Sequence, residues 1–222
     1  MIKGAVNSEG KGEYRRKAQL DNACAQTPGE PFSDQAALLM RILNDVYGVN
    51  GNNRYGDLLK KMAVCFKDRF EPYQGALIWD LDIGNDYAGG SVDDTSHANR
   101  QPRTVIDLYE SGIVFDKSYV EGLANLLTQV IWDGSFNAPR FTNFIDGSNN
   151  AALGRPPWGL GLIYTGWALL GQYDPKVHEV ADATLRAILD GKSNPSLDYN
   201  ATSFGRLSLA GHLAKNIAGQ KK

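Results

Sequence analysis

The stretch that decides the fold is residues 33–66, which read SDQAALLMRILNDVYGVNGNNRYGDLLKKMAVCF. Its first half carries apolar residues three or four positions apart, which is typical of one buried helix face: Ala36, Leu39, Leu43 and Val46. Ser33 is a plausible N-cap for this helix. A polar loop over residues 50–53 then reverses the chain into a second apolar series that ends at Phe66. The stretch therefore predicts a helical hairpin.

The hairpin pattern recurs further along the chain. We expect helices at 105–112, 119–131, 158–170, 177–189 and 203–217. The first helices of the pairs begin near Ser33, Asp94 and Pro156, about 60 residues apart. The connectors at 76–82 and 140–146 are also alike, because each is an extended aromatic and acidic segment followed by a polar loop.

These repeats predict one all-α domain of helical hairpins. We expect it to span residues 32–222 and to form an (α/α) toroid, an incomplete toroid or a horseshoe. Residues 1–31 are polar and lack helical periodicity, so we interpret them as an N-terminal arm.

Composition excludes several classes of function. The chain is 42% hydrophobic and 22% charged with a net charge of -2, which is ordinary for a globular protein and lacks the basic stripe of a nucleic-acid-binding surface. No apolar run reaches the length of a membrane span, and no secretory signal is visible. The two cysteines, Cys24 and Cys65, leave a disulfide between them open.

The best candidate site is residues 93–100, which read DDTSHANR. Asp94 fits the N-cap of a helix, where its carboxylate accepts hydrogen bonds from the first backbone amides. Pro102 predicts either a kink or a helix that begins only near Gln101. In both cases His97 lies at an irregular helix entrance, where its side chain can point into a cleft and act as a general base.

The chain resembles the α/α-toroid (six-hairpin-like) carbohydrate-active proteins, which include polysaccharide lyases, uronyl hydrolases and glucuronyl epimerases. The resemblance spans Pro31 to about Gly219 and is carried by four motifs: Ser33-Asp34-Gln35-Ala36, Ile78-Trp79-Asp80, Asp94-Thr95-Ser96-His97-Ala98-Asn99 and Trp158-Gly159-Leu160-Gly161. Complete toroids of this type have more hairpins than the three pairs and single helix expected here. The resemblance implies an acidic poly- or oligosaccharide as partner and an extracellular or periplasmic location.

Lyase-type β-elimination is the first functional hypothesis. His97 would remove the C5 proton of a uronate, while Asn99 and Arg100 would neutralise the substrate carboxylate. Tyr87 is the first candidate for the proton donor to the leaving oxygen, and Tyr164 is the second. The structural alternative is that Asp94 only caps the helix, His97 bonds a carbonyl and Arg100 makes an ion pair.

The connector residues offer rival readings. Aspartates crowd the first connector and one lies at the equivalent place in the second, so a pair of them could hydrolyse glycosides: Asp80, Asp82, Asp86, Asp93, Asp94 and Asp146. Trp79 and Trp158 could stack on sugar faces. The other residues expected to bind substrate are Asp80, Asp94, Asn143, Asp146 and Tyr164.

Two further alternatives remain. The acidic loop could be solvated surface, and the domain could be a non-catalytic α-solenoid that binds a glycan or a protein. Oxygen ligands could hold Ca²⁺, but the spacing does not fit an EF-hand, so we predict no metal and no cofactor.

Overall fold

The computed structural model describes residues 34–79, 93–149, 157–159, 161–163, 166–192, 194 and 203–219. This part of the chain is mostly helical, which confirms the all-α class. The predicted arm lies outside the described residues, as do Asp80, Asp82, Asp86, Tyr87 and Tyr164.

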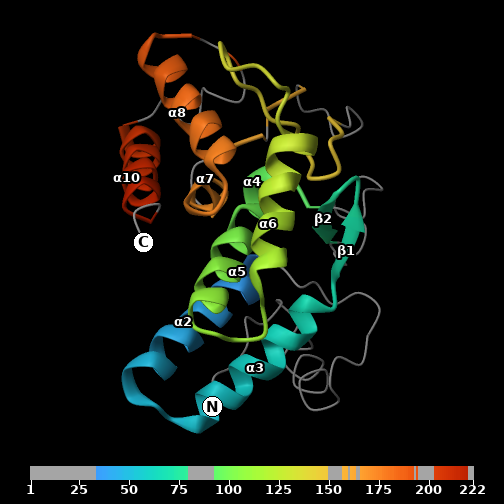
Figure 1. The fold of residues 1–222 in the computed structure, drawn as a ribbon, viewed down its shortest axis with the longest axis vertical. Coiled ribbons are helices and arrows are strands. Elements are labelled where there is room, and N and C mark those ends of the chain that lie inside the picture. The colour runs from blue at the N-terminus through green and yellow to red at the C-terminus, as the bar shows by residue number, and fades with distance from the viewer. Residues whose placement is uncertain are drawn as a thin grey trace, which may run out of the picture.

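Two long helices form the first hairpin: α2 (Asp34–Asn50) and α3 (Asn53–Lys67). They lie side by side at one end of the molecule in Figure 1, and α2 also packs on α5 (Arg100–Glu110). The Asn52 side chain caps α3 by accepting a hydrogen bond from the backbone of Arg54. The predicted hairpin over residues 33–66 is therefore confirmed.

A β-hairpin follows α3. Strand β1 (Phe70–Tyr73) pairs antiparallel with β2 (Ala76–Trp79), with Phe70 opposite Trp79. Gln74 and Gly75, which join them, both have positive φ angles of 49° and 80°. Such a two-residue turn matches the twist of paired strands. The sequence predicted the extended segment at 76–79 but missed its partner.

The helices of the second half of the chain pack against those of the first half. Helix α6 (Lys117–Asn125) continues into a π-helical turn, η1 (Leu126–Ile131), and packs on β2. Helices α7 (Gly166–Leu169), η3 (Leu170–Gln172), α8 (Pro175–Leu189) and α10 (Ser203–Gly219) gather at the other end in Figure 1. One continuous apolar core runs from Met40 on α2 to Leu213 on α10.

The expected helix over 158–170 is wrong in its first half. Trp158 lies in a turn with a φ of 68°, and residues 161–163 are not helical. Gly161 explains the difference, because a Cβ atom there would collide with the Phe141 carbonyl. The glycine lets this segment run directly against the 140–149 connector instead of coiling.

Cys65 is 3% exposed and is engaged in a disulfide, while Cys24 lies outside the described residues. None of the helices in the described part of the chain combines the length and the apolar character that crossing a membrane requires.

Candidate functional site

The candidate site is built around a four-residue helix, α4 (Thr95–Ala98). Asp94 caps it, and Asp94 Oδ1 accepts hydrogen bonds from the backbone amides of Ser96 and His97, both at 3.0 Å. Asn99 forms a turn, and α5 then begins at Arg100, so Pro102 falls in its first turn, where a missing N–H costs nothing. The predicted cap and the predicted irregular entrance are both confirmed.

The cap also pairs a carboxylate with an imidazole. Asp94 Oδ2 lies 2.5 Å from His97 Nδ1, while the side chains are 5% and 51% exposed respectively. Burial raises the pKa of Asp94, but hydrogen bonds from His97 and Ser96 outweigh it, and the pKa is lowered overall. A buried carboxylate that holds Nδ1 fixes the ring orientation and tautomer, as in hydrolases that use a histidine base.

The segment that carries Asp94 is pinned by the second connector. Thr95 N donates to Asn143 O at 2.8 Å, and Ile145 N donates to Asp93 O at 3.1 Å. The Thr95 hydroxyl donates to Thr142 O at 2.7 Å. The second connector therefore lies directly against the start of α4.

Trp158 is tied to the same connector. Asn149 Oδ1 accepts from the backbone amides of Asn143, at 3.0 Å, and Trp158, at 2.9 Å. The Arg140 guanidinium lies 4.7 Å from the Trp158 ring centre and also pairs with Asp133. A cation and an aromatic ring are therefore linked by hydrogen bonds to the segment that presents His97.

Two other predicted site residues, Trp79 and Asn99, are buried in the interior. Trp79 is 1% exposed and stacks on Trp167 at 6.2 Å. Asn99 is 3% exposed, with its side chain bonded to Ser96 O and to Gly166 N. Both therefore pack the interior instead of facing a ligand in this structure.

Of the two remaining predicted site residues, Asp146 is held by hydrogen bonds and Arg100 is exposed. Asp146 Oδ1 accepts from Ser148 N, and its carbonyl accepts from the Tyr73 hydroxyl at 3.1 Å. Arg100 is exposed on the first turn of α5.

Asp93 is the residue whose role the sequence did not reveal. It is 2% exposed, and burial, followed by the charge of Asp94, raises its pKa to about 8. Gln101 Nε2 donates to Asp93 Oδ2 at 3.3 Å. No local signal distinguishes Asp93 from Asp94, because the side chains that surround Asp93, Trp79 on β2 and Gln101 on α5, are brought to it by the fold.

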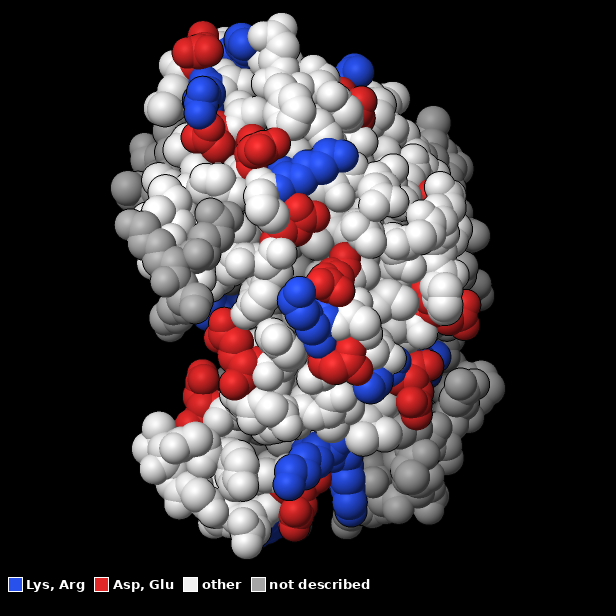
Figure 2. Space-filling model, in the orientation of Figure 1, with Lys and Arg blue, Asp and Glu red and all other residues white. Residues whose placement is uncertain are grey.

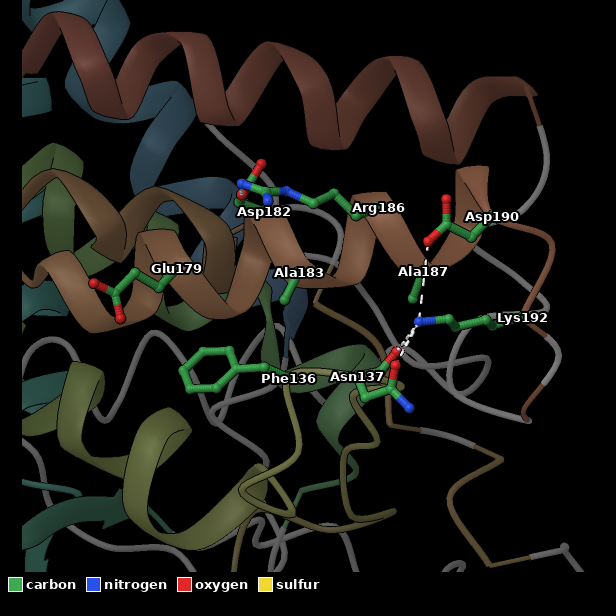
Figure 3. Close-up of a pocket in the computed structure, with 9 residues that line it drawn as sticks. All are labelled: Phe136, Asn137, Glu179, Asp182, Ala183, Arg186, Ala187, Asp190 and Lys192. Atoms are coloured by element: carbon green, nitrogen blue, oxygen red, sulfur yellow. Dashed lines mark hydrogen bonds and ion pairs between the residues drawn. The ribbon is translucent and has the colours of Figure 1, made fainter.

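A shallow groove of about 420 Å³ lies elsewhere, between α8 and the 136–137 turn (Figure 3). Many of its charged groups are paired within it: Arg186 bonds Asp182, and Lys192 Nζ donates to Asn137 O at 2.7 Å. Since nothing there singles out a ligand, the candidate site remains at His97.

Surface charge and metal-ligating groups favour no other class of site. Figure 2 shows acidic and basic side chains interspersed on the visible face, with no large patch of one sign. The described residues contain no group of three His, Cys, Asp or Glu arranged to hold a metal ion.

A search of family models, of characterised proteins and of solved structures finds no match to this chain.

Proposed function

We propose that this chain is a carbohydrate-active domain that cleaves an acidic polysaccharide by β-elimination, with His97 as the general base. The observation that carries the proposal is the 2.5 Å contact between His97 Nδ1 and the buried Asp94 carboxylate, which leaves the ring half exposed. Because Nδ1 keeps its proton and donates it in a hydrogen bond to the Asp94 carboxylate, Nε2 is the basic nitrogen of the ring.

His97 Nε2 takes the C5 proton of a uronate, the C5 electron pair forms a C4–C5 double bond, and the C4–O bond breaks. The leaving oxygen receives a proton from an acid. The sequence offers Tyr87 and Tyr164 for that role, both outside the described residues. The imidazolium that forms is stabilised by Asp94, whose pKa is already held low by His97 and Ser96.

Cationic and aromatic side chains near the second connector support an acidic sugar as ligand. Arg140 over Trp158 combines a positive charge with a ring, and aromatic rings pack well against the apolar faces of sugars. Arg100 is exposed on the first turn of α5, close in the chain to His97, where it could meet a substrate carboxylate.

The helix pairs also fit the proposal. Helices α2 and α3, α5 and α6, and α7 and α8 each pack on one another in chain order. We take them as part of an α/α toroid or an open horseshoe, the scaffold that the sequence resemblance implies.

Glycoside hydrolysis is the second candidate, favoured by one observation. The adjacent carboxyls of Asp93 and Asp94 have pKa values displaced in opposite directions, which is the pattern of an acid and base pair. The 2% exposure of Asp93 argues against it, because a substrate oxygen would have to reach a buried group.

The test is incubation with a panel of uronic-acid polymers while the ultraviolet absorbance of unsaturated product is followed. We expect His97→Asn to lower kcat about 10² to 10⁴-fold, the usual contribution of a general base. His178→Asn, on α8, is the matched control and should leave the rate unchanged.

The other possible results of this assay distinguish the alternative functions. Reducing ends without the chromophore would replace elimination by hydrolysis. Saturable polymer binding without turnover, unaffected by His97→Asn, would make the domain a binding module. An intact folded protein that neither binds nor cleaves any polymer would refute the proposal.

A further inference from the structure

Beside Asp93 lies a buried hydrogen-bond acceptor that an ionised carboxylate cannot satisfy, because a carboxylate has no proton to donate. Asp93 is 2% exposed, and Gln101, on the first turn of α5, is fully buried beside it. Gln101 Nε2 donates to Asp93 Oδ2 at 3.3 Å. Gln101 Oε1 is buried with no donor among the described residues.

An orphaned amide oxygen in this position needs a donor, because a buried acceptor without a partner is strongly unfavourable. A carboxylate has no proton to donate, whereas a carboxylic acid has one hydroxyl donor and a carbonyl acceptor. If the Gln101 amide is rotated by half a turn, its oxygen takes the position 3.3 Å from Asp93 Oδ2, and two oxygens at that distance need a proton between them. Both orientations of the amide therefore favour the neutral acid.

The neighbours of Asp93 supply little to stabilise a negative charge there. Two uncharged N–H groups lower the pKa of Asp93, the Trp79 indole from β2 and the backbone amide of Asp94, but the geometry of the Trp79 contact falls short of a full hydrogen bond. The charged or titratable groups that act on Asp93 are Asp94, which disfavours a second negative charge, and His97 on α4, which favours it. Gln101 on α5 and Trp79 on β2 are uncharged.

We propose that Asp93 is a positioning residue that works as a neutral carboxylic acid, donating its proton to Gln101 Oε1 and thereby fixing the segment that presents Asp94 to His97. The backbone oxygen of Asp93 accepts from Ile145 N, and Thr95 N donates to Asn143 O. The side chain of Asp93 therefore adds a contact to a segment whose backbone is already hydrogen-bonded to the second connector. The importance of that segment for catalysis rests on the proposed function, but the protonation of Asp93 does not.

Protonation of Asp93 also determines the total charge of the Asp93–Asp94 pair. With Asp93 protonated, the two adjacent aspartates carry one negative charge, located on Asp94 and directed to His97 Nδ1. Ionisation of Asp93 would add a second negative charge in the same buried region. This ionisation would change the electrostatic environment of the His97 ring, since the two groups interact electrostatically.

The first test needs no variant. Infrared spectroscopy of the wild-type protein near neutral pH should show the carbonyl stretch of a protonated carboxylic acid, and the band should disappear reversibly as the pH rises through about 8. Asp93→Asn should abolish the band. Asp45→Asn, which replaces an exposed carboxylate on α2, should leave it intact.

The second test follows the His97 ring proton resonances by NMR across the same pH range. Wild type should show an extra inflection near pH 8, and Asp93→Asn should lack it while keeping the His97 resonances of a folded site. Absence of the infrared band, or an alkaline inflection that persists in Asp93→Asn, would overturn the proposal. Neither readout depends on turnover, so failure to cleave any polymer would count against the proposed function alone.

Discussion

Replacing Asp93 by asparagine should stabilise the protein, and the gain should depend on pH. Asp93 has a pKa of about 8 when folded against an ordinary value of 3.8. Between these two values the unfolded chain has released the proton and the folded chain has kept it. Wild-type stability therefore falls as the pH rises through this window and becomes constant above about pH 8.

The size of the effect follows from the same two values. Each pH unit within the window removes about 1.4 kcal/mol, which accumulates to about 4 kcal/mol at pH 7. Asparagine does not titrate, and its amide can still donate to Gln101 Oε1 and accept from Gln101 Nε2. Asp93→Asn should therefore match wild type near pH 4 and exceed it by on the order of 4 kcal/mol near pH 7.

The assay is urea unfolding at a series of pH values from about 4 to about 9, with the slope m compared between variants. Asp45→Asn, on the exposed face of α2, is the control and should follow the wild-type pH dependence. A stability difference between Asp93→Asn and wild type that does not change with pH would refute the reasoning. Such a result would mean that the folded protein holds Asp93 ionised.

Three further substitutions test the packing around the site. Gly166→Ala should destabilise the fold by about 1 to 3 kcal/mol, because a Cβ atom there would collide with the Asn99 carbonyl. Thr95→Val removes a buried hydrogen bond to Thr142 O and should cost about 1 to 3 kcal/mol. Asp94→Ala removes the cap of α4 and should cost about 0.5 to 2 kcal/mol, measured like the others by chemical denaturation.

Matched controls separate these effects from general sensitivity. Gly211→Ala lies in α10 with open space around it and should be neutral or stabilising. Thr184→Val loses a bond to Val180 O within its own helix, so it should cost less than Thr95→Val. Equal losses in each matched pair would contradict the assigned contacts.

Local patterns predicted much of the fold. The apolar spacing of residues 36–46 placed α2 correctly, and Pro102 marked the break between α4 and α5. The prediction failed at 158–163, where apolar residues suggested a helix. Residues 161–163 are buried without forming a helix, and Gly161 lies against the Phe141 backbone.

The sequence alone sets the features that act over one helical turn. Asp94 and His97 are three residues apart, so a cap at Asp94 brings their side chains together wherever α4 packs.

Tertiary structure alone decided the rest. Thr95 bonds Thr142 and Trp167, partners 47 and 72 residues away, and Trp79 is enclosed by the same packing. The difference between Asp93 and Asp94 arises there as well, because a carboxyl's pKa is set by burial and by its neighbours in space, which two adjacent aspartates in the chain do not share.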